Sequence, residues 1–458
     1  MARELLGNIR GPQGVQGPPG EMNEFLVSIS DFGGVGDGVT DDSGALKSML
    51  ESGFNNFYIP DNEYLIKEKI EVVRDNFKII SDGVLNFELN GDICFTVTGD
   101  NVELNLNIDG NNLARGGIKV TGNNVFVKDS NLYNFYSEVA SAFGVFAENC
   151  GRLEIKNNFI SSVQSVGNGE TGDSIGQSRG VWISNNHDNH TDGIVIKDNN
   201  IYGIIGEEGD AIHLINGLPN PHFKQLVSVV TGNTLINFSR RGIKIQASDV
   251  EISNNIFKEN LDSSTHPSRV IDIVYASDTV VLNNYVKTKT LSSIGVTTDD
   301  TVNSKTLFFN NIFTQLNNNL MLYVLRAKNV TFNSNAFYTA GRFVGIDKSV
   351  NVYFTNNTFE SEHNDGTTVG VSISSASDKI VFKSNLFNKG VFDWIFQNKS
   401  TNAVISDNIS TTESDGIRTF EESLGSLYLN NVFSGVAVYG SGSTEHTLKS
   451  YIQTGGNV

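Results

Sequence analysis

The sequence predicts an all-β protein, a β-solenoid in which short strands stack coil upon coil. Two observations predict this fold. The 458 residues include 45 glycines but only 7 prolines, a balance that favours many tight turns between short strands. A short signature, Asn-Asn or a close variant followed by apolar residues, also returns at intervals of 22 to 42 residues, and repeats of this period indicate stacked units.

The second asparagine of each signature marks the expected repeat. Asparagine tolerates the left-handed backbone of a tight turn, and stacked asparagine side chains can hydrogen-bond from coil to coil. The marker residues are Asn131, Asn158, Asn200, Asn233, Asn255, Asn284, Asn311, Asn335, Asn357, Asn385, Asn408 and Asn431. The phenylalanines expected to stack inside the solenoid are Phe159, Phe257, Phe313, Phe337, Phe359, Phe387 and Phe433.

The N-terminal part carries a different pattern. Glycine occupies every third position from Gly11 to Gly20, which is the pattern of collagen, because only glycine fits the crowded axis of three polyproline-II strands. So few triplets need neighbouring segments to hold three chains together, and the pattern therefore favours a homotrimer. A flexible Pro/Gly linker is the alternative interpretation.

Residues 27–53 predict a short strand, a glycine-rich turn and a helix. Thr40 is the expected N-cap, with Asp41 and Asp42 in the first turn, where the helix dipole favours acidic residues. Gly53 is expected to end the helix. The apolar stripe that would face the core consists of Ala45, Leu46, Met49 and Leu50.

The stretch DFGGVGDGVTDD at 31–42 resembles the opening motif of the pectate-lyase-like family of bacteriophage tailspikes and tail appendages. The resemblance implies that the helix caps a right-handed parallel β-helix, that the protein is a homotrimer, and that its N-terminus attaches to phage tail or baseplate proteins. The chain then divides into an N-terminal attachment segment (1–26, with the collagen-like repeat at 11–20), a capping strand–turn–helix (27–60), the parallel β-helix (61–433) and a C-terminal cap or tail (434–458).

Composition and charge argue against several classes of protein. The 33 basic and 51 acidic residues leave a net charge of −18, which disfavours a nucleic-acid partner because phosphates need compensating Lys and Arg. No apolar run reaches the roughly 18–20 residues of a membrane helix, and no signal peptide is visible at the first residues. Neither Cys94 nor Cys150 lies in a Cys/His cluster, and no dense group of aspartates supports a calcium site, so we expect no metal and no cofactor.

A second repeated pattern, two apolar residues separated by one other residue, predicts the functional face. It occurs in six strands, at 116–120, 143–147, 179–183, 210–214, 241–245 and 269–273. Between the two inward apolar residues, the outward column is Lys119, Phe146, Trp182, His213, Lys244 and Asp272. Two residues before the first apolar one, a neighbouring column is Gly116, Phe143, Arg179, Asp210, Arg241 and Arg269.

These columns predict a carbohydrate-binding groove. An outward tryptophan offers a flat apolar face for a sugar ring, and arginine suits carboxylate or phosphate through its two-pronged guanidinium. A basic strip on so acidic a protein favours an anionic polymer, such as a uronic-acid glycan or a teichoic acid. The substrate-binding candidates are Arg179, Trp182, His213, Arg241, Lys244 and Arg269. The alternative is structural, with Arg and Asp merely neutralising one another along the solenoid.

The catalytic candidates are carboxylates, because glycoside hydrolysis uses a pair of them. They are Asp210 with Glu207 or Glu208, together with Asp272, Glu170 and Asp173. The segment 207–214 also loosely resembles a stretch of the polygalacturonases, in which Asp210 matches the second of two aspartates while Gly209 replaces the first. A lyase would instead need a base, for which Arg241 and Lys244 are candidates.

The function expected from the sequence is that of a phage tail spike or appendage, located on the virion and acting outside the cell. It would bind a bacterial surface polysaccharide and depolymerise it by hydrolysis or β-elimination. Two alternatives stay open: a non-catalytic receptor-binding or structural appendage of the virion, and a secreted bacterial polysaccharide lyase.

Overall fold

The computed structural model of the chain describes most residues after the N-terminal segment. The described residues are 26–166, 176–185, 190–216, 225–261, 268–299, 303–362, 369–374, 376–389, 393–411, 415–419, 423, 425–433, 438–439 and 447–453. The collagen-like repeat at 11–20 and the candidates Glu170 and Asp173 lie outside them.

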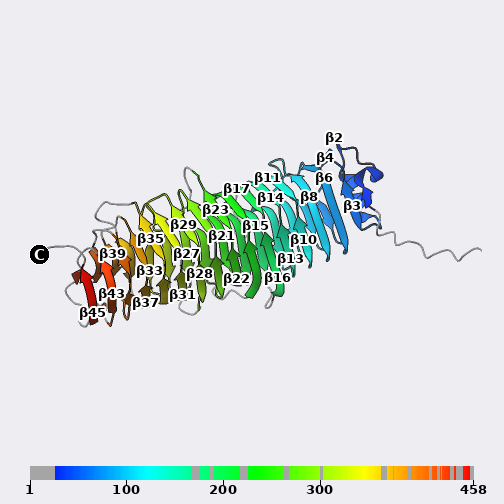
Figure 1. Cartoon of the computed structure of the whole chain (residues 1–458). Coiled ribbons are helices and arrows are strands. Elements are labelled where there is room, and N and C mark those ends of the chain that lie inside the picture. Colours follow the sequence, from blue (N-terminus) through cyan, green and yellow to red (C-terminus); the bar gives the residue numbers. More distant parts are fainter. Residues whose placement is uncertain are drawn as a thin grey trace, which may run out of the picture.

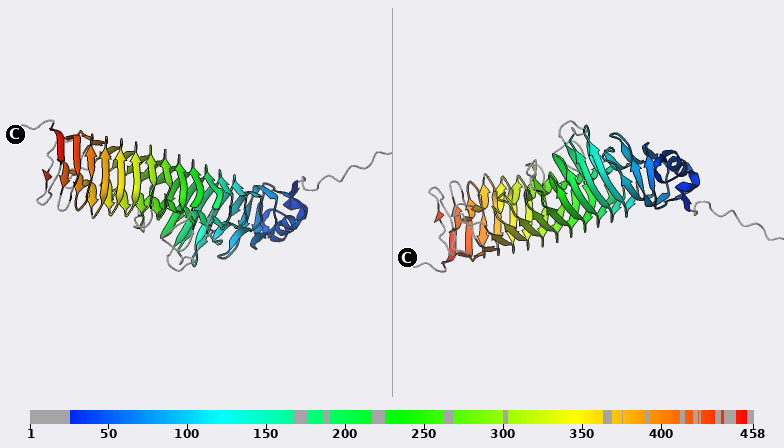
Figure 2. Two further views of the ribbon diagram at one scale, coloured as in Figure 1. Left: turned by 90° about the horizontal axis from the view of Figure 1, so that it is seen from below. Right: turned by 90° about the horizontal axis from the view of Figure 1, so that it is seen from above.

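The described chain is an elongated parallel β-helix with a cap at its N-terminal end (Figures 1 and 2). Its strands form two sheets, one of 15 strands and one of 30, and the strands of neighbouring coils pair in parallel. We call the 15-stranded sheet sheet B and the 30-stranded sheet sheet A. Each full coil contributes one strand to sheet B and two to sheet A, and the two strands of sheet A are joined by a short turn.

Sheet B consists of β5 (Ile70–Val72), β7 (Ile93–Val97), β9 (Gly116–Val120), β12 (Ala142–Glu148), β15 (Gln177–Asn185), β18 (Glu208–Asn216), β21 (Arg241–Gln246), β24 (Arg269–Val274), β27 (Ser292–Thr297), β30 (Leu322–Leu325), β33 (Val344–Asp347), β36 (Val369–Ser374), β39 (Asp393–Gln397), β42 (Asp415–Thr419) and β44 (Val438–Tyr439).

One row of sheet A consists of β1 (Leu26–Ser28), β3 (Asn56–Ile59), β10 (Val125–Lys128), β13 (Leu153–Lys156), β16 (His190–Lys197), β19 (Gln225–Thr231), β22 (Ser248–Ser253), β25 (Thr279–Leu282), β28 (Thr306–Phe309), β31 (Lys328–Asn333), β34 (Val350–Thr355), β37 (Asp378–Lys383) and β40 (Val404–Ser406). The other row consists of β2 (Asp37–Asp41), β4 (Glu63–Ile66), β11 (Asn131–Ser137), β14 (Phe159–Ser165), β17 (Asn200–Ile205), β20 (Thr234–Phe238), β23 (Ile256–Glu259), β26 (Tyr285–Thr288), β29 (Ile312–Gln315), β32 (Ala336–Thr339), β35 (Thr358–Ser361), β38 (Leu386–Asn388) and β41 (Ile409–Ser410). Four long strands run through both rows: β6 (Phe77–Phe87), β8 (Val102–Asp109), β43 (Leu427–Phe433) and β45 (Thr447–Gln453).

The cap contains a 3₁₀ turn, η2 (Ile29–Phe32), and a helix, α1 (Ser43–Glu51). The predicted apolar stripe is confirmed, since Leu46, Met49 and Leu50 are buried in the core. The predicted caps were wrong. Asp42 rather than Thr40 is the N-cap, and Ser52 rather than Gly53 is the C-cap. The Asp42 carboxylate accepts hydrogen bonds from the preceding glycine-rich loop instead of from the helix.

The asparagine ladder is confirmed, and the two residues of each Asn-Asn pair have different roles. The first residue takes the left-handed conformation, as in Asn283 (φ 55). The second is buried and bonds to both neighbouring coils. Asn284 donates from Nδ2 to Asn311 Oδ1 (3.0 Å) and to the Ile252 carbonyl (2.9 Å), while its own Oδ1 accepts from the backbone N–H of Asn255 (2.9 Å).

The ladder position was wrong by one residue in two coils. Ser130 and Asn199, rather than Asn131 and Asn200, occupy the column that contains Asn158. In these coils a polar run of three residues precedes the strand, and the local pattern does not distinguish which of them turns the chain. Phe159 is exposed instead of buried because it directly follows its ladder residue Asn158, whereas the buried Phe257 and Phe313 lie two residues after theirs.

Stacked phenylalanines fill the C-terminal half of the core. The predicted stack is confirmed from Phe313 to Phe387, with ring centroids about 5 Å apart in successive coils. Phe257 is buried as well, whereas the side chain of Phe433 lies outside the described part. A second stack, which the sequence analysis missed, runs through Phe308, Phe332, Phe354 and Phe382.

Among the described residues, no helix combines the length and the apolar character needed to cross a membrane.

Candidate functional site

The predicted register of sheet B is confirmed. Arg179 pairs with Asp210 and Asp210 with Arg241 in successive strands, which places them in one column. Beside it, Trp182 pairs with His213, His213 with Lys244, and Lys244 with Asp272. The site lies on β15, β18, β21 and β24, and β15 and β18 are the longest strands of sheet B at nine residues each.

A bend in each strand brings the two columns to the same side of the sheet. Strict alternation would place Asp210 and His213 on opposite faces, because they are three residues apart. In β18, however, the consecutive residues Ala211 and Ile212 both belong to the hydrophobic core. The equivalent position in β21 is Gly242, where a Cβ atom would come within 2.6 Å of the Phe257 ring. Two consecutive inward residues shift the alternation by one position, so that both columns face outward.

The centre of the site is Arg241, which contacts three carboxylates. Its Nη1 lies 2.9 Å from Glu208 Oε2 and 3.2 Å from Asp210 Oδ1, and its Nε lies 3.0 Å from Asp272 Oδ2. All four residues come from consecutive strands of sheet B. Burial alone would lower the pKa of Arg241, but the three carboxylates outweigh it and raise the pKa. Arg241 is therefore a permanent cation and cannot serve as the base of a lyase.

Asp210 is fully buried between two arginines. Arg179 Nε lies 3.4 Å from its Oδ2, opposite the contact with Arg241. Burial raises the pKa of Asp210, but Arg179, Arg241 and Lys244 outweigh burial and the pKa is lowered. The carboxylate stays ionised at all ordinary pH values, which does not suit the proton donor of a glycosidase.

His213 positions Arg179. Arg179 Nε donates to His213 Nδ1 (3.2 Å), so Nδ1 must carry the lone pair and Nε2 the proton, which faces Gln246 Oε1 at 2.8 Å. Burial and the neighbouring Lys244 and Arg179 lower the pKa of His213. The ring is therefore neutral, and both of its nitrogens are occupied by protein partners.

Glu208 and Glu207 stand at the edge of the site. The Glu208 carboxylate forms ion pairs with Arg240, Arg241 and Arg179. Glu207 lies in the turn before β18, and its carbonyl oxygen accepts from Arg240 Nη1 (3.3 Å). The Glu208 side chain thus contacts two other candidates, Arg179 and Arg241, whereas the Glu207 carbonyl contacts Arg240, which was not predicted.

Lys244 differs from the other cations of the site. Within the described residues no carboxylate lies within ion-pairing distance of its Nζ, although it stands between His213 and Asp272 in its column. Burial and the nearby Arg241 lower the pKa of Lys244 to about 8. A half-buried ammonium without a carboxylate partner is available to an anionic ligand.

Trp182 forms the N-terminal boundary of the charged residues. Its indole is half-buried and stacks on Phe146, with ring centroids 4.2 Å apart. Its Nε1–H is buried and has no hydrogen-bond partner among the described residues. A ring with one side packed and one unused donor is suited to contact a sugar.

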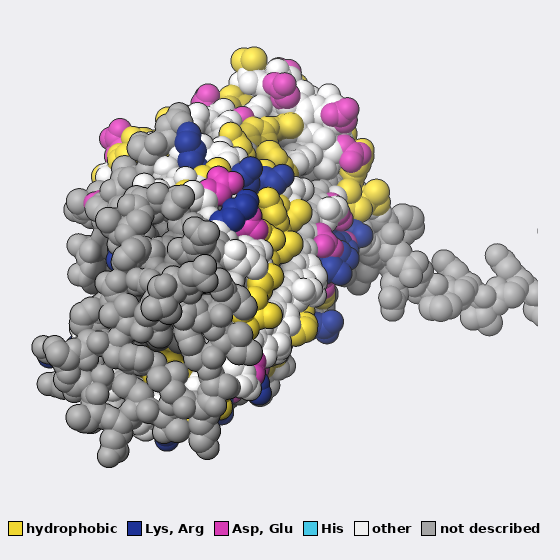
Figure 3. All heavy atoms as spheres, turned by 60° about the vertical axis from the view of Figure 1, so that its left-hand side comes forward, with side chains coloured by type: hydrophobic (Ala, Val, Ile, Leu, Met, Phe, Trp, Pro, Cys, Tyr) yellow, Lys and Arg dark blue, Asp and Glu magenta, His cyan; other side chains and the backbone are white. Residues whose placement is uncertain are grey.

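We call the residues Arg179, Glu208, Asp210, Arg240, Arg241, Lys244, Arg269 and Asp272 the charged cluster. Its five cations outnumber its three carboxylates, and they still do when Glu207 is included. The expected open groove is corrected by the structure, because Arg179, Asp210, Arg241 and Asp272 are buried. They lie outside the hydrophobic core and cover one another. Figure 3 shows basic and acidic side chains crowded together beside a hydrophobic stripe on one flank of the molecule.

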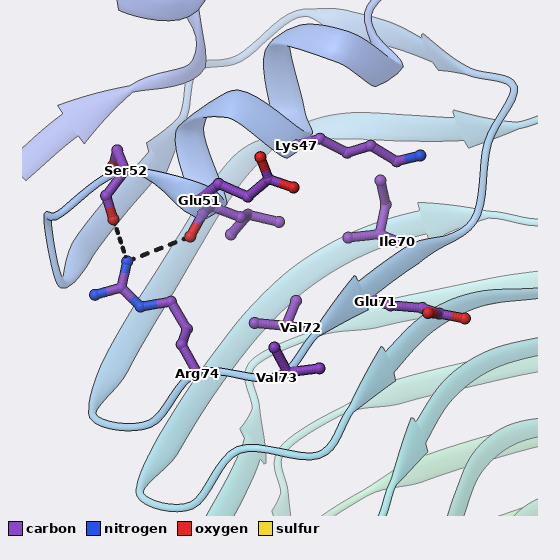
Figure 4. A pocket seen from close by; sticks show the side chains of 9 residues that line it. Lys47, Glu51, Ser52, Ile70, Glu71, Val72, Val73 and Arg74 are labelled. Carbon is purple, nitrogen blue, oxygen red and sulfur yellow. Dashed lines mark hydrogen bonds between the residues drawn. The ribbon is translucent and has the colours of Figure 1, made fainter.

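A hollow lies at the cap, apart from the charged cluster, and has a structural explanation. Figure 4 shows this hollow of about 300 Å³ between the end of α1 and β5. Arg74 spans it and donates to the carbonyl oxygens of Leu50 and Ser52, which satisfies the last turn of the helix. Within the described residues, no group of His, Cys, Asp and Glu side chains is placed to hold a metal ion at either region.

The sequence analysis missed Arg240 and Gln246. Arg240 precedes Arg241 directly, so alternation would direct it away from the site, yet it contacts Glu208. The Arg-Arg pair was the available signal. Gln246 follows the last apolar residue of β21, and only the position of the His213 ring reveals its role.

The fold is that of known β-helix proteins. A mutant tailspike of E. coli bacteriophage HK620, solved with a pentasaccharide, is 13% identical with a TM-score of 0.54, over 87% of this chain and 78% of that chain. The A-module of the Azotobacter vinelandii mannuronan C-5 epimerase AlgE4 is 14% identical (TM-score 0.39; 92% and 99% covered), and the Streptococcus pneumoniae surface adhesin PfbA is 14% identical (TM-score 0.45; 89% and 91% covered). The tailspike likeness confirms the predicted right-handed parallel β-helix and concerns the fold alone. No protein-family model and no curated protein matches the sequence.

Proposed function

We propose that the outer face of sheet B, from Trp182 to Lys244, binds an acidic bacterial surface polysaccharide. The observation that carries the proposal is Lys244, a cation without a carboxylate partner among the described residues, in a cluster where cations outnumber carboxylates. Burying unmatched positive charge is costly unless an anion completes the site. The sugar's acid group would complete it, and Trp182 would contact the ring.

The remaining cluster supports this role by holding the binding groups rigid. Asp210 and Asp272 fix Arg241, and His213 fixes Arg179. Arginines that are already oriented lose little freedom when a ligand binds. The fold is compatible with a glycan ligand, since the HK620 tailspike that shares it was solved with a pentasaccharide.

Binding to polysaccharides tests the proposal directly. The full chain is titrated with polygalacturonate, alginate and teichoic acid, with neutral dextran as the uncharged control, and binding is followed by calorimetry. We expect at least one acidic polymer to bind and dextran not to bind. Lys244→Met should abolish the binding, whereas Lys389→Met, which removes an exposed lysine paired with Glu360, should not change it. Equal binding by both variants would overturn the proposal.

A second candidate function, cleavage by β-elimination, is favoured by the pKa of about 8 at Lys244. Neutral Lys244 would take the proton α to a uronate carboxylate. The electron pair released would form a double bond to the neighbouring carbon and expel the glycosidic oxygen, which takes a proton from water. Arg179 would stabilise the negative charge on the carboxylate.

The pH dependence separates the two functions. Binding needs the charged lysine, so affinity should weaken as the pH rises through about 8. Elimination needs the neutral lysine, so its rate should rise over the same range, with a matching gain in ultraviolet absorbance from unsaturated ends. Hydrolysis by Asp210 and Glu208 or Asp272 would shorten the polymer without that absorbance, and it is the least favoured because Asp210 is buried and ionised.

The proposal includes the setting that the sequence indicates, a trimeric appendage on a phage tail that is attached through its N-terminal segment. The Gly-X-Y repeat at 11–20 supports three chains. Sedimentation equilibrium of the full chain and of a chain lacking residues 1–25 tests this point. A trimer that needs the N-terminal segment supports it, and a monomeric full chain contradicts it.

A further inference from the structure

The column that contains Trp182 and Lys244 continues beyond the charged cluster to a second aromatic ring. Lys244 pairs with Asp272, Asp272 with Gly295, and Gly295 with Tyr323. Tyr323 in β30 is half-buried on the outer side of the sheet. Five strand spacings separate it from Trp182, which is roughly 24 Å along the solenoid axis.

Gly295 makes room for Arg269 to lie along the surface between these residues. A Cβ atom at Gly295 would come within 2.0 Å of Arg269 Cδ and 2.6 Å of Asp272 Oδ1. Without that atom, the Arg269 side chain crosses Gly295 and brings its guanidinium carbon to 5.2 Å from the centre of the Tyr323 ring. Arg269 therefore reaches from β24 to β30 and is held against an aromatic face.

Asp272 supplies an unused acceptor at the same place. Its Oδ2 is bound by Arg241 Nε at 3.0 Å, whereas its Oδ1 is buried and has no hydrogen bond among the described residues. Arg269 Nη1 lies 3.9 Å from that oxygen, which is too far for a hydrogen bond. The Arg269 side chain is 31% exposed, so its guanidinium can still take a ligand carboxylate.

We infer that Arg269, Asp272 and Tyr323 form a second sugar subsite, so that the ligand is a linear polyuronate lying along the solenoid axis from Trp182 to Tyr323. Arg269 binds a uronate carboxylate, Asp272 Oδ1 accepts a sugar hydroxyl, and the Tyr323 ring contacts the sugar face. A cation, a hydroxyl acceptor and an aromatic ring together complement the carboxylate, the hydroxyl groups and the ring face that a uronate residue presents. This inference rests on the function proposed above and adds the orientation and the minimum length of the ligand.

The inference predicts that affinity depends on ligand length. A disaccharide cannot span the distance between Trp182 and Tyr323, whereas a longer oligomer can contact both. Galacturonate and mannuronate oligomers of two to eight residues are titrated into the full chain by calorimetry. We expect affinity to rise steeply once the oligomer reaches both rings, and then to level off.

Substitutions at Tyr323 and Gly295 test whether the gain in affinity of the long oligomers comes from the second subsite. Tyr323→Ala should weaken the binding of the long oligomers by about tenfold and leave the shortest unchanged, while Tyr323→Phe, which keeps the ring, should stay within about twofold of the parent. Gly295→Ala, which displaces Arg269, should act like Tyr323→Ala. The control is Tyr353→Ala, which removes an exposed tyrosine of sheet A and should change nothing.

The outcomes distinguish this inference from the proposed function. Affinity that does not depend on length, or a Tyr323→Ala variant that binds long oligomers normally, overturns the second subsite and leaves the first standing. Failure of every uronate oligomer, while teichoic acid binds through Lys244, overturns the polyuronate ligand alone. Failure of every acidic polymer overturns both. Circular dichroism of each variant confirms that the solenoid is folded.

Discussion

Two ladders run along this solenoid, and they use polar groups in opposite ways. The asparagine ladder inside the turn of sheet A repeats one residue type, and Asn284 shows both of its side-chain polar atoms bonded to neighbouring coils. The charged cluster on sheet B is built from four residue types, Arg, Lys, Asp and Glu. Polar atoms of Arg240 and Asp272 in this cluster, and of the neighbouring Trp182, have no hydrogen bonds among the described residues.

The difference separates a ladder whose polar groups are all bonded from a cluster in which some are not. A repeated neutral amide donates upward and accepts downward, so each added coil satisfies the one before, and nothing remains for a ligand. A mixed column of ions cannot repeat in this way. Its leftover donors and its surplus cations are unfavourable in the free protein, and under the proposed function a bound acidic polymer would satisfy them.

The largest effect on stability should come from Asp210→Asn. Removing this charge takes from Arg179 and Arg241 the fully buried carboxylate between them and leaves Glu208 as the one carboxylate that both still contact. This should lower the free energy of unfolding by about 3–5 kcal/mol in urea titrations. Asp198→Asn, at an exposed ion pair with Lys197, is the control and should change it by less than about 0.5 kcal/mol. Equal effects of the two substitutions would show that the cluster contributes no more than a surface pair.

The stabilisation by Asp210 should also depend on pH in a defined direction. Because the pKa of Asp210 is lowered in the folded protein, its stabilisation is complete above the ordinary aspartate value and is lost as the pH falls below that value. The difference in unfolding free energy between the parent and Asp210→Asn should therefore shrink only in strong acid. A difference that is already lost near pH 5 would contradict the lowered pKa.

Asn284→Ala should come next. It leaves the Asn255 N–H without its acceptor and the Ile252 carbonyl without its donor, both buried, at a cost of about 2–4 kcal/mol in chemical unfolding. The matched control is Asn131→Ala, because Asn131 makes a similar amide–amide bond to Asn107 (2.7 Å) at the surface. The control should cost less than about 1 kcal/mol, and a cost as large as that of Asn284→Ala would argue against burial as the cause.

Lys244→Met should have a smaller effect of opposite sign. The lowered pKa means that folding disfavours the charged lysine, so the variant should gain on the order of 1–3 kcal/mol at pH 7 while losing ligand binding. The gain should vanish as the pH rises from about 8 towards the ordinary lysine value, since the unfolded parent then releases the same proton. Thermal unfolding across this pH range measures it, and a destabilised variant would show that Lys244 has a structural partner.

Trp182→Leu should have the smallest effect on stability, about 1 kcal/mol from the lost stacking on Phe146. Binding of the acidic polymer should nevertheless weaken by about tenfold, because the proposed ligand contacts the indole ring. A change in stability without a change in affinity would assign Trp182 to packing alone.

Much of this architecture could be predicted from local pattern. The alternation of apolar residues was sufficient to align six strands of sheet B, and Arg179, Asp210 and Arg241 do share a column. The asparagine repeat located the turns, apart from the coils of Ser130 and Asn199. These features depend on residues that are neighbours in the chain or on a fixed strand spacing.

The remaining features depend on distances across coils. The bend at Ala211 and Gly242 that brings two columns together, the contact of Arg240 with Glu208, and the path of Arg269 over Gly295 have no local signature. These three features depend on the distance between neighbouring coils and on the space that a missing side chain leaves, as at Gly295.

The sequence by itself therefore determined the solenoid, its turns and the register that concentrates charge on one face. Only the tertiary structure decided which of those charges pair with one another and which remain without a partner among the described residues. The physical reason is that register follows from a period of two residues along the strand, whereas an ion pair or an unused donor depends on a few tenths of an ångström between side chains of different coils.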